Sequence, residues 1–187
     1  MTESPDTKDA ATAFIQRVEN LDNRELAQLR RACGDRLKDR TSVLWFVGVV
    51  RGAAPEEVAF LVATLLAQYK TQTIRSGGHS WRGPSPDAPD WHANVGDAWR
   101  LATRDAQPGA SIRRRMHILL DSSIDPDGGG DLPYRLRQMV RYLAARGIGL
   151  DWPQLLRDLR RWNYPDRPVQ KAWARAYFSP QDVQSNP

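Results

Sequence analysis

Residues 55–70 read PEEVAFLVATLLAQYK, and this stretch decides the fold. A proline followed by two glutamates is typical of a helix N-terminus. Proline lacks the amide hydrogen that the first turn leaves unpaired, and acidic side chains offset the positive end of the helix dipole. From Val58 to Ala67, apolar side chains lie on nearly every side of that helix. A helix of this kind is normally enclosed by others, so the stretch predicts the central helix of a bundle.

Helical spacing of apolar residues continues on both sides of this stretch. Asp22 to Glu25 form the pattern of a capping box, which predicts that the helix preceding the central one begins here. Gly34 breaks or ends that helix. The other predicted helices occupy residues 9–19, 94–104, 111–121, 131–146, 152–162 and 168–178. The short apolar run at 44–50 is interpreted as a buried helix, with a strand as the less favoured alternative. No segment alternates with the period of a β-strand. We therefore expect an all-α protein of about nine helices in two small bundles.

A segment rich in glycine and proline separates the two predicted bundles. Residues 76–90 read SGGHSWRGPSPDAPD and have no helical period. Trp81 and Trp91 lie in or beside this segment, where they could stack on bases or dock a partner. The expected organisation is a disordered N-terminus (1–8), an N-terminal helical bundle (9–70), a Gly/Pro-rich loop (71–93), a basic C-terminal helical bundle (94–178) and a flexible tail (179–187).

The composition excludes several classes of protein. The single cysteine, Cys33, can form neither an internal disulfide nor a cysteine zinc site. The longest apolar runs, at 43–50 and 58–67, are far shorter than the ~18 residues that a membrane span requires. The chain begins MTESPDTKDA, which is polar and has no hydrophobic stretch behind it. We therefore expect no signal peptide, no membrane contact and a cytoplasmic location.

Positive charge is concentrated in the second half of the chain. Residues 1–99 contain 12 Lys and Arg against 13 Asp and Glu, whereas residues 100–187 contain 15 against 9. Arginine supplies 23 of the 27 basic residues, and its planar guanidinium suits phosphate and stacks on bases. A bias in composition alone would affect both halves equally. The asymmetry therefore predicts a surface for a polyanion.

Three predicted helices carry clusters of arginines on their outer faces. The clusters are Arg113, Arg114 and Arg115; Arg137 and Arg141; and Arg157, Arg160 and Arg161. Like charges at helical spacing repel one another, so selection for stability alone would place acids between them. The clusters therefore favour a polyanion as partner. Two alternatives remain open: solvated faces whose apolar stems cover the core, and pairing with the carboxylates of a partner protein.

Signals for catalysis or for a cofactor are weak. No nucleophile lies beside a base, the three histidines are scattered, and the glycine runs lack the Lys and Ser ending of a phosphate loop. Asp125, Asp127 and Asp131 resemble part of a calcium loop, but the glutamate that should close it is missing. We expect no enzymatic activity, no metal and no cofactor. A metal-dependent enzyme built on these three aspartates is the least favoured hypothesis.

The order of several motifs resembles one protein family. The motifs are LRR at 29–31, FLVATL at 60–65, RRMHILL at 114–120, LRQMV at 136–140, LDWPQLLRDL at 150–159 and VQKAWAR at 169–175. Over residues 11–178 they are together similar to the small subunit of the type I-E CRISPR surveillance complex Cascade, the CasB family. The Gly/Pro-rich loop and the tail find no match in that pattern.

This resemblance implies an all-helical, non-enzymatic subunit, present in the complex as a head-to-tail pair. Its expected partners are the large subunit, the backbone subunits, a second copy of itself, the crRNA and the target DNA. The family is taken to hold the displaced non-target strand and to touch the guide–target region through surface basic residues. Matching positions in this chain are Arg31, Arg115, Arg137 and Arg167. Arg114 and Arg141 join them as candidates from the clusters described above.

A free-standing helical regulator that binds nucleic acid is the main alternative. Such a protein would need a recognition helix that enters a groove after a short glycine turn. The turn Arg146-Gly147-Ile148-Gly149, before the helix predicted at 152–162, is the one place that could serve. Pro153 and the apolar Leu155-Leu156 pair argue against that use.

Overall fold

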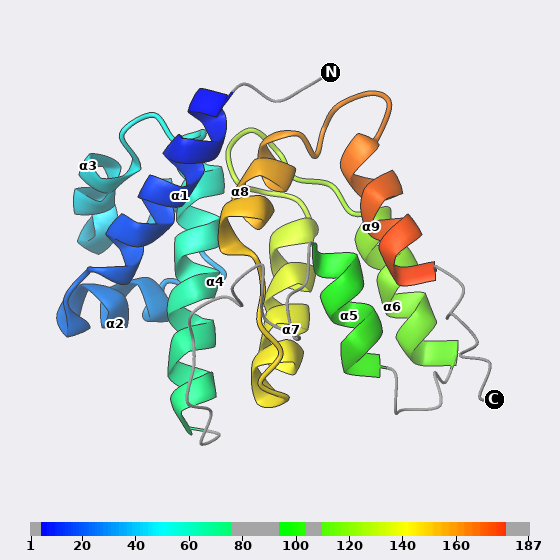
Figure 1. Ribbon diagram of the computed structural model, residues 1–187. Helices are drawn as coiled ribbons and strands as arrows, with labels where there is room; N and C mark the ends of the chain where they lie inside the picture. Colours follow the sequence, from blue (N-terminus) through cyan, green and yellow to red (C-terminus); the bar gives the residue numbers. More distant parts are fainter. Residues whose placement is uncertain (1–4, 76–93, 104–109, 179–187) are drawn as a thin grey trace.

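The computed structural model describes residues 5–75, 94–103 and 110–178, which form nine α-helices and two short 3-10 helices (Figure 1). The α-helices are α1 (Pro5–Glu19), α2 (Asn23–Arg31), α3 (Val47–Val50), α4 (Glu56–Arg75), α5 (Val95–Thr103), α6 (Ala110–Leu120), α7 (Leu132–Ala145), α8 (Trp152–Arg160) and α9 (Pro168–Phe178). The 3-10 helices are η1 (Leu37–Asp39) and η2 (Thr41–Phe46). Over these ranges the chain has no strand, and the all-α fold class is confirmed.

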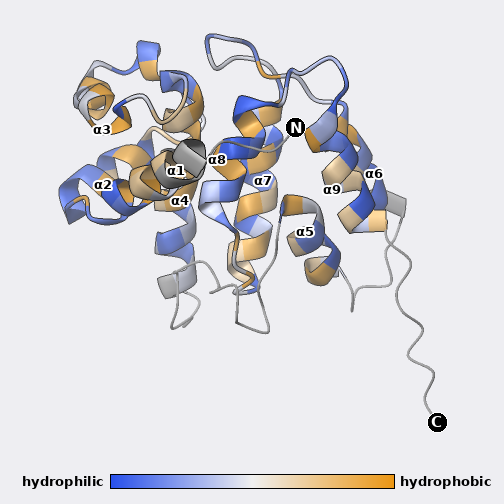
Figure 2. Ribbon diagram, turned by 45° about the horizontal axis from the view of Figure 1, so that its top comes forward, coloured by the Kyte–Doolittle hydropathy of each residue, from blue (hydrophilic) through white to orange (hydrophobic). Residues whose placement is uncertain are grey.

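The central helix predicted from the sequence is α4. It contacts α2 on one side and α7 and α8 on the other, and Figure 1 shows it between the N-terminal helices and the rest of the molecule. Near its C-terminal end, the Tyr69 hydroxyl donates a hydrogen bond of 3.0 Å to the carbonyl oxygen of Ile148. Buried side chains from both groups of helices belong to one hydrophobic cluster, and the helices turn their apolar faces toward it (Figure 2).

Several helix ends lie where the sequence places them. The carboxylate of Asp22 accepts the amide of Glu25 at 2.7 Å, and that of Glu25 accepts the amide of Asp22 at 2.9 Å, so the capping box is confirmed. After α2, Gly34 takes a φ of 106°, a conformation that L-residues rarely adopt. At the start of α8, the carboxylate of Asp151 accepts the amide of Gln154 at 2.8 Å. Local chemistry therefore determines these boundaries.

Other helix boundaries differ from the predicted ones. α4 continues to Arg75 instead of ending at Lys70, and within this extension the hydroxyls of Thr71 and Thr73 donate to carbonyl oxygens one turn earlier. α1 begins at Pro5, four residues before the predicted start. The apolar run at 44–50 is helical, but it is divided between η2 and α3, and its Leu44 side chain is exposed.

Some predicted features lie outside the described residues. They are the Gly/Pro-rich segment from residue 76 to 93 with Trp81 and Trp91, the tail at 179–187, and residues 1–4 of the predicted disordered N-terminus. The division into two bundles at residues 71–93 accordingly stays a prediction. Among the described helices, none is both long enough and apolar enough to cross a lipid bilayer.

The C-terminal helices enclose a buried carboxylate. Asp158 on α8 accepts hydrogen bonds from the indole nitrogen of Trp173 on α9 and from the amide nitrogen of Gln154, each at 2.7 Å. Arg157 is also buried, and its Nε and Nη2 donate to the amide oxygen of Gln154 at 3.1 and 2.8 Å. Burial, the largest influence, raises the pKa of Asp158 from 3.8 to about 6. This network joins α8 to α9.

Candidate nucleic-acid interface

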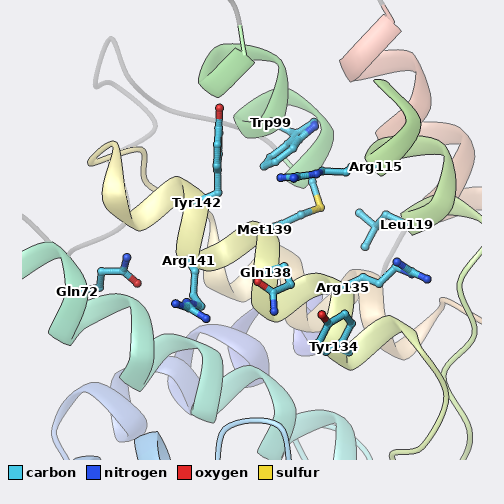
Figure 3. A pocket seen from close by; sticks show the side chains of 10 residues that line it. All are labelled: Gln72, Trp99, Arg115, Leu119, Tyr134, Arg135, Gln138, Met139, Arg141 and Tyr142. Carbon is cyan, nitrogen blue, oxygen red and sulfur yellow. The ribbon is translucent and has the colours of Figure 1, made fainter. Parts of the chain in front are cut away.

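A groove of about 480 Å³ crosses the outer face of α7 (Figure 3). It forms because α7 buries one apolar stripe, which includes Leu136 and Val140, and leaves its polar side open between α4 and α6. The groove is lined by residues of four helices: Gln72, Trp99, Arg115, Leu119, Tyr134, Arg135, Gln138, Met139, Arg141 and Tyr142. Side chains far apart in sequence therefore line one concave surface.

Two of the candidate arginines line this groove. Arg115 extends from α6 and Arg141 from α7, and both side chains are exposed (Figure 3). In the part of the chain that the structure describes, neither has a hydrogen-bond or ion-pair partner. Arg135 is different, because its Nε pairs with the Asp131 carboxylate at 3.1 Å. No aspartate or glutamate is among the lining residues, so all the charged side chains that line the groove are arginines.

Aromatic and apolar groups complete the groove. The side chain of Tyr134 is 61% exposed, and Leu119 and Met139 form an apolar floor. Tyr142 packs against Trp99 with ring centroids 4.9 Å apart, and the guanidinium carbon of Arg146 lies 3.6 Å from the Tyr142 ring centroid. The arrangement combines cations with flat apolar surfaces, which is how proteins bind unpaired nucleotides.

Arg31 and Arg114 lie outside the groove. Arg31 is the last residue of α2, and Arg114 precedes the groove residue Arg115 on α6. Both side chains are exposed, and no described residue pairs with either of them. The structure does not bring them together with Arg115 and Arg141.

Arg137 is half-buried on the flank of α7 that faces the end of α2. Its Nη1 lies 2.6 Å from the position that a Cβ on Gly34 would occupy, and its Nε is buried without a hydrogen-bond partner in the described residues. Burial raises the pKa of the nearby Cys33 thiol, and the positive charge of Arg137 partly opposes that change. The Cys33 thiol donates to the amide oxygen of Gln68 at 2.9 Å. Arg137 therefore packs beside the turn that follows α2 instead of lining the groove.

Arg167 makes contacts that hold the end of α6. Its Nη2 donates to the backbone carbonyl of Leu120, the last residue of that helix, and pairs with the Asp121 carboxylate at 3.2 Å. A cation near helix C-terminal carbonyls satisfies their unpaired lone pairs and the negative end of the dipole. These contacts account for Arg167 structurally and leave it apart from the other candidate arginines.

The third arginine cluster predicted from the sequence is corrected by the structure. Arg157 does not stand outside with Arg160 and Arg161, because it is 7% exposed and binds Gln154 in the buried network of α8. Only Arg160 is fully exposed, while Arg161 is half-buried with its guanidinium carbon 5.8 Å from the Tyr164 ring centroid. The outer face of α8 is therefore less basic than the spacing suggested.

Two of the three aspartates of the hypothetical metal loop pair with other residues. Asp127 pairs with Lys38 at 2.6 Å and with Arg36 at 3.3 Å, and the Lys38 hydrogen bond is the main cause that lowers its pKa. Asp131 accepts the amide of Ser123 at 3.0 Å and pairs with Arg135. Within residues 5–75, 94–103 and 110–178, no three ligating side chains converge in a way that could hold a metal ion.

Comparisons with known proteins place the chain in a family. A family model of CRISPR-associated protein Cse2 matches residues 25–178. The chain belongs to the Cse2 family. CRISPR-associated protein Cse2 of Thermus thermophilus is 40% identical over 79 residues, which make up 42% of this chain and 42% of that protein. The match therefore spans less than half the length of that curated relative.

Solved structures agree with this Cse2 assignment. The crystal structure of M. ruber CasB matches with a TM-score of 0.67 and 26% identity, covering 90% of this chain and 92% of that one. A chain of a CRISPR RNA-guided surveillance complex matches the fold with a TM-score of 0.65 and 24% identity, covering 91% and 92%. The family resemblance inferred from the ordered motifs is thus confirmed.

Proposed function

We propose that this Cse2-family chain is a non-catalytic small subunit of a cytoplasmic Cascade complex, and that it stabilises the R-loop by binding the displaced non-target DNA strand. The single observation that carries the proposal is the acid-free groove across α7, in which Arg115 and Arg141 have no partner among the described residues. Such a surface neutralises phosphates without reading sequence, as a complex that accepts arbitrary targets requires.

The proposed partners are the large subunit, the backbone subunits, a second copy of the chain, the crRNA and the target DNA. The fold match to a chain of an RNA-guided surveillance complex supports the protein partners. Exchange of a DNA duplex for a guide–target duplex is nearly balanced in free energy, so a few protein–phosphate contacts can tip it. In this proposal Arg31 and Arg114 add contacts beyond the groove, and Arg137, which lies outside the groove beside Gly34, adds a separate one.

The free-standing regulator is less well supported by the structure. Its candidate recognition helix, α8, buries Leu155, Leu156 and Arg157 and is tied to α9 through Asp158. A helix that uses these side chains in the core cannot insert them between the walls of a DNA groove.

The double variant R115A/R141A is expected to shorten the lifetime of the R-loop about tenfold in the assembled complex, because two phosphates of the displaced strand lose their counter-charge. The slope of log affinity against log salt should also become shallower by about 1.4, at roughly 0.7 for each single-strand phosphate. Both quantities are measured on the complex recovered by coexpressing the tagged chain with its genomic neighbours.

A matched control removes the same charge elsewhere. Arg24 on α2 and Arg160 on α8 are exposed, and neither has a partner among the described residues. R24A/R160A should leave the lifetime and the salt slope close to those of the unmodified complex. Equal lifetimes for R115A/R141A and the unmodified chain would contradict a role for the groove, and failure to recover any guide RNA with the tagged chain would contradict the assembly itself.

A further inference from the structure

We propose that the α7 groove holds one unpaired nucleotide, with its base against the Tyr134 ring and its flanking phosphates on Arg115 and Arg141. This inference rests on the proposed function and adds that the groove takes a flipped-out or single-stranded base, not only a charged backbone. The arrangement that carries it runs along one face of α7, where Tyr134, Gln138 and Arg141 follow one another at spacings of four and three residues, with Arg115 opposite on α6 (Figure 3).

Tyr134 is the most exposed of the large hydrophobic side chains in the described residues, at 61%. Its hydroxyl has no hydrogen-bond partner in the described part of the chain, and its ring packs against no other ring there. Neither the core nor a hydrogen bond accounts for this residue. An exposed ring in a groove that also contains unpaired arginines is suited to hold a nucleobase, since every base has a flat face that stacks.

Gln138 lies between the aromatic and the cationic ends of this face. It is exposed, lines the groove and has no partner in the described residues. Its side-chain amide both donates and accepts hydrogen bonds, so it can meet the polar edge of any base held on Tyr134. Consecutive positions on the face are about 4.5 to 6 Å apart along the helix axis, which places ring, amide and guanidinium within the reach of a single nucleotide.

A nucleotide fits the groove better than an acidic peptide does. Carboxylates would pair with Arg115 and Arg141 but would leave the Tyr134 ring and the floor of Leu119 and Met139 uncovered. A nucleotide covers the apolar surfaces with its base while its phosphates meet the guanidinium groups. A paired base in a duplex is stacked on its neighbours and cannot reach Tyr134, so the groove should prefer single strands.

The test compares two oligonucleotides that carry the same phosphates. The full chain is titrated with a thymidine oligonucleotide and with an abasic oligonucleotide of equal length, and binding is followed by fluorescence anisotropy at low salt. The unmodified chain should bind the thymidine strand about tenfold more tightly than the abasic strand. Y134A should abolish that preference and leave affinity for the abasic strand unchanged, whereas Y134F should retain it. R115A should weaken binding of both strands.

The outcomes separate this inference from the proposed function. Equal affinity of the unmodified chain for the two strands, or binding to neither, would overturn the nucleotide site. The site is also overturned if Y134A keeps the thymidine preference but prevents recovery of the complex, because the groove would then hold a partner protein. If only the result for Y134A differs from the expectation, the nucleotide site is contradicted but the proposed phosphate contacts are not. If R115A/R141A binds both oligonucleotides as tightly as the unmodified chain, both proposals are contradicted. Circular dichroism of each variant confirms that the helices remain folded.

Discussion

Gly96→Ala is expected to lower the free energy of unfolding by about 3 kcal/mol, because α5 and α9 touch through backbone at this position. A Cβ on Gly96 would lie 2.8 Å from the carbonyl carbon of Trp173 and closer still to its oxygen. Both groups belong to helix backbone, so neither can turn aside as a flexible side chain would. The two helices must separate, and the packing of Trp173 against Trp162, with ring centroids now 5.0 Å apart, would loosen.

Gly48→Ala provides the matched control for this substitution. Gly48 lies in α3, and a Cβ there meets no atom within 4 Å. Alanine restricts the unfolded chain more than glycine does, so the free energy of unfolding of this variant should rise by about 0.5 kcal/mol or stay unchanged. Urea unfolding of the two variants and the parent chain measures the difference. A Gly96→Ala variant as stable as the Gly48→Ala variant would show that α5 and α9 can part at no cost.

Asp158 is expected to make the folded state more stable as the pH falls from 7 to 4. Its pKa is about 6 in the folded protein against an ordinary value of 3.8, and burial is the main cause. Between these two values the folded chain takes up a proton that the unfolded chain does not, so protonation favours folding. Above pH 6 the charged carboxylate therefore lowers the free energy of unfolding by about 3 kcal/mol, and by pH 4 its protonation restores about 2 kcal/mol of that loss.

The measurement is the difference in unfolding free energy between the parent chain and D158N at each pH. The exposed aspartates with lowered pKa values, Asp127 and Asp131, weaken both proteins alike at low pH and cancel in this difference. As the pH falls, the unfolding free energy of the parent chain should rise relative to that of D158N. A flat difference would contradict the raised pKa. Should D158N fail to fold, the carbon NMR signal of the Asp158 carboxyl in the parent chain should still titrate near pH 6.

Features that depend on neighbouring residues could be predicted from the sequence. Three such features each depend on residues a few positions apart in the chain. They are the apolar residues on nearly every side of α4, the capping box of Asp22 and Glu25, and the turn at Gly34. The extension of α4 to Arg75 could not be predicted from the sequence, because it contains Thr71 and Thr73 and threonine is a poor helix former. In the structure, Thr71 and Thr73 hydrogen-bond to the helix that carries them.

The candidate site could be predicted only in part, because it is assembled across helices. Local charge is enough to single out Arg115 and Arg141, but that they line one groove depends on how α6 packs beside α7. The spacing misplaces Arg157, because its burial follows from the Gln154–Asp158 network between α8 and α9. Charge spacing does not single out Tyr134, although an aromatic residue on the polar side of a basic helix is a signal that can be read from the sequence.

Met139 belongs both to the hydrophobic core and to the lining of the groove. The distance between the guanidinium groups of Arg115 and Arg141 therefore depends in part on the core, because the volume of the Met139 side chain helps to set how far α6 lies from α7. A bulkier or smaller residue at position 139 would therefore change the width of the groove without altering a single charge.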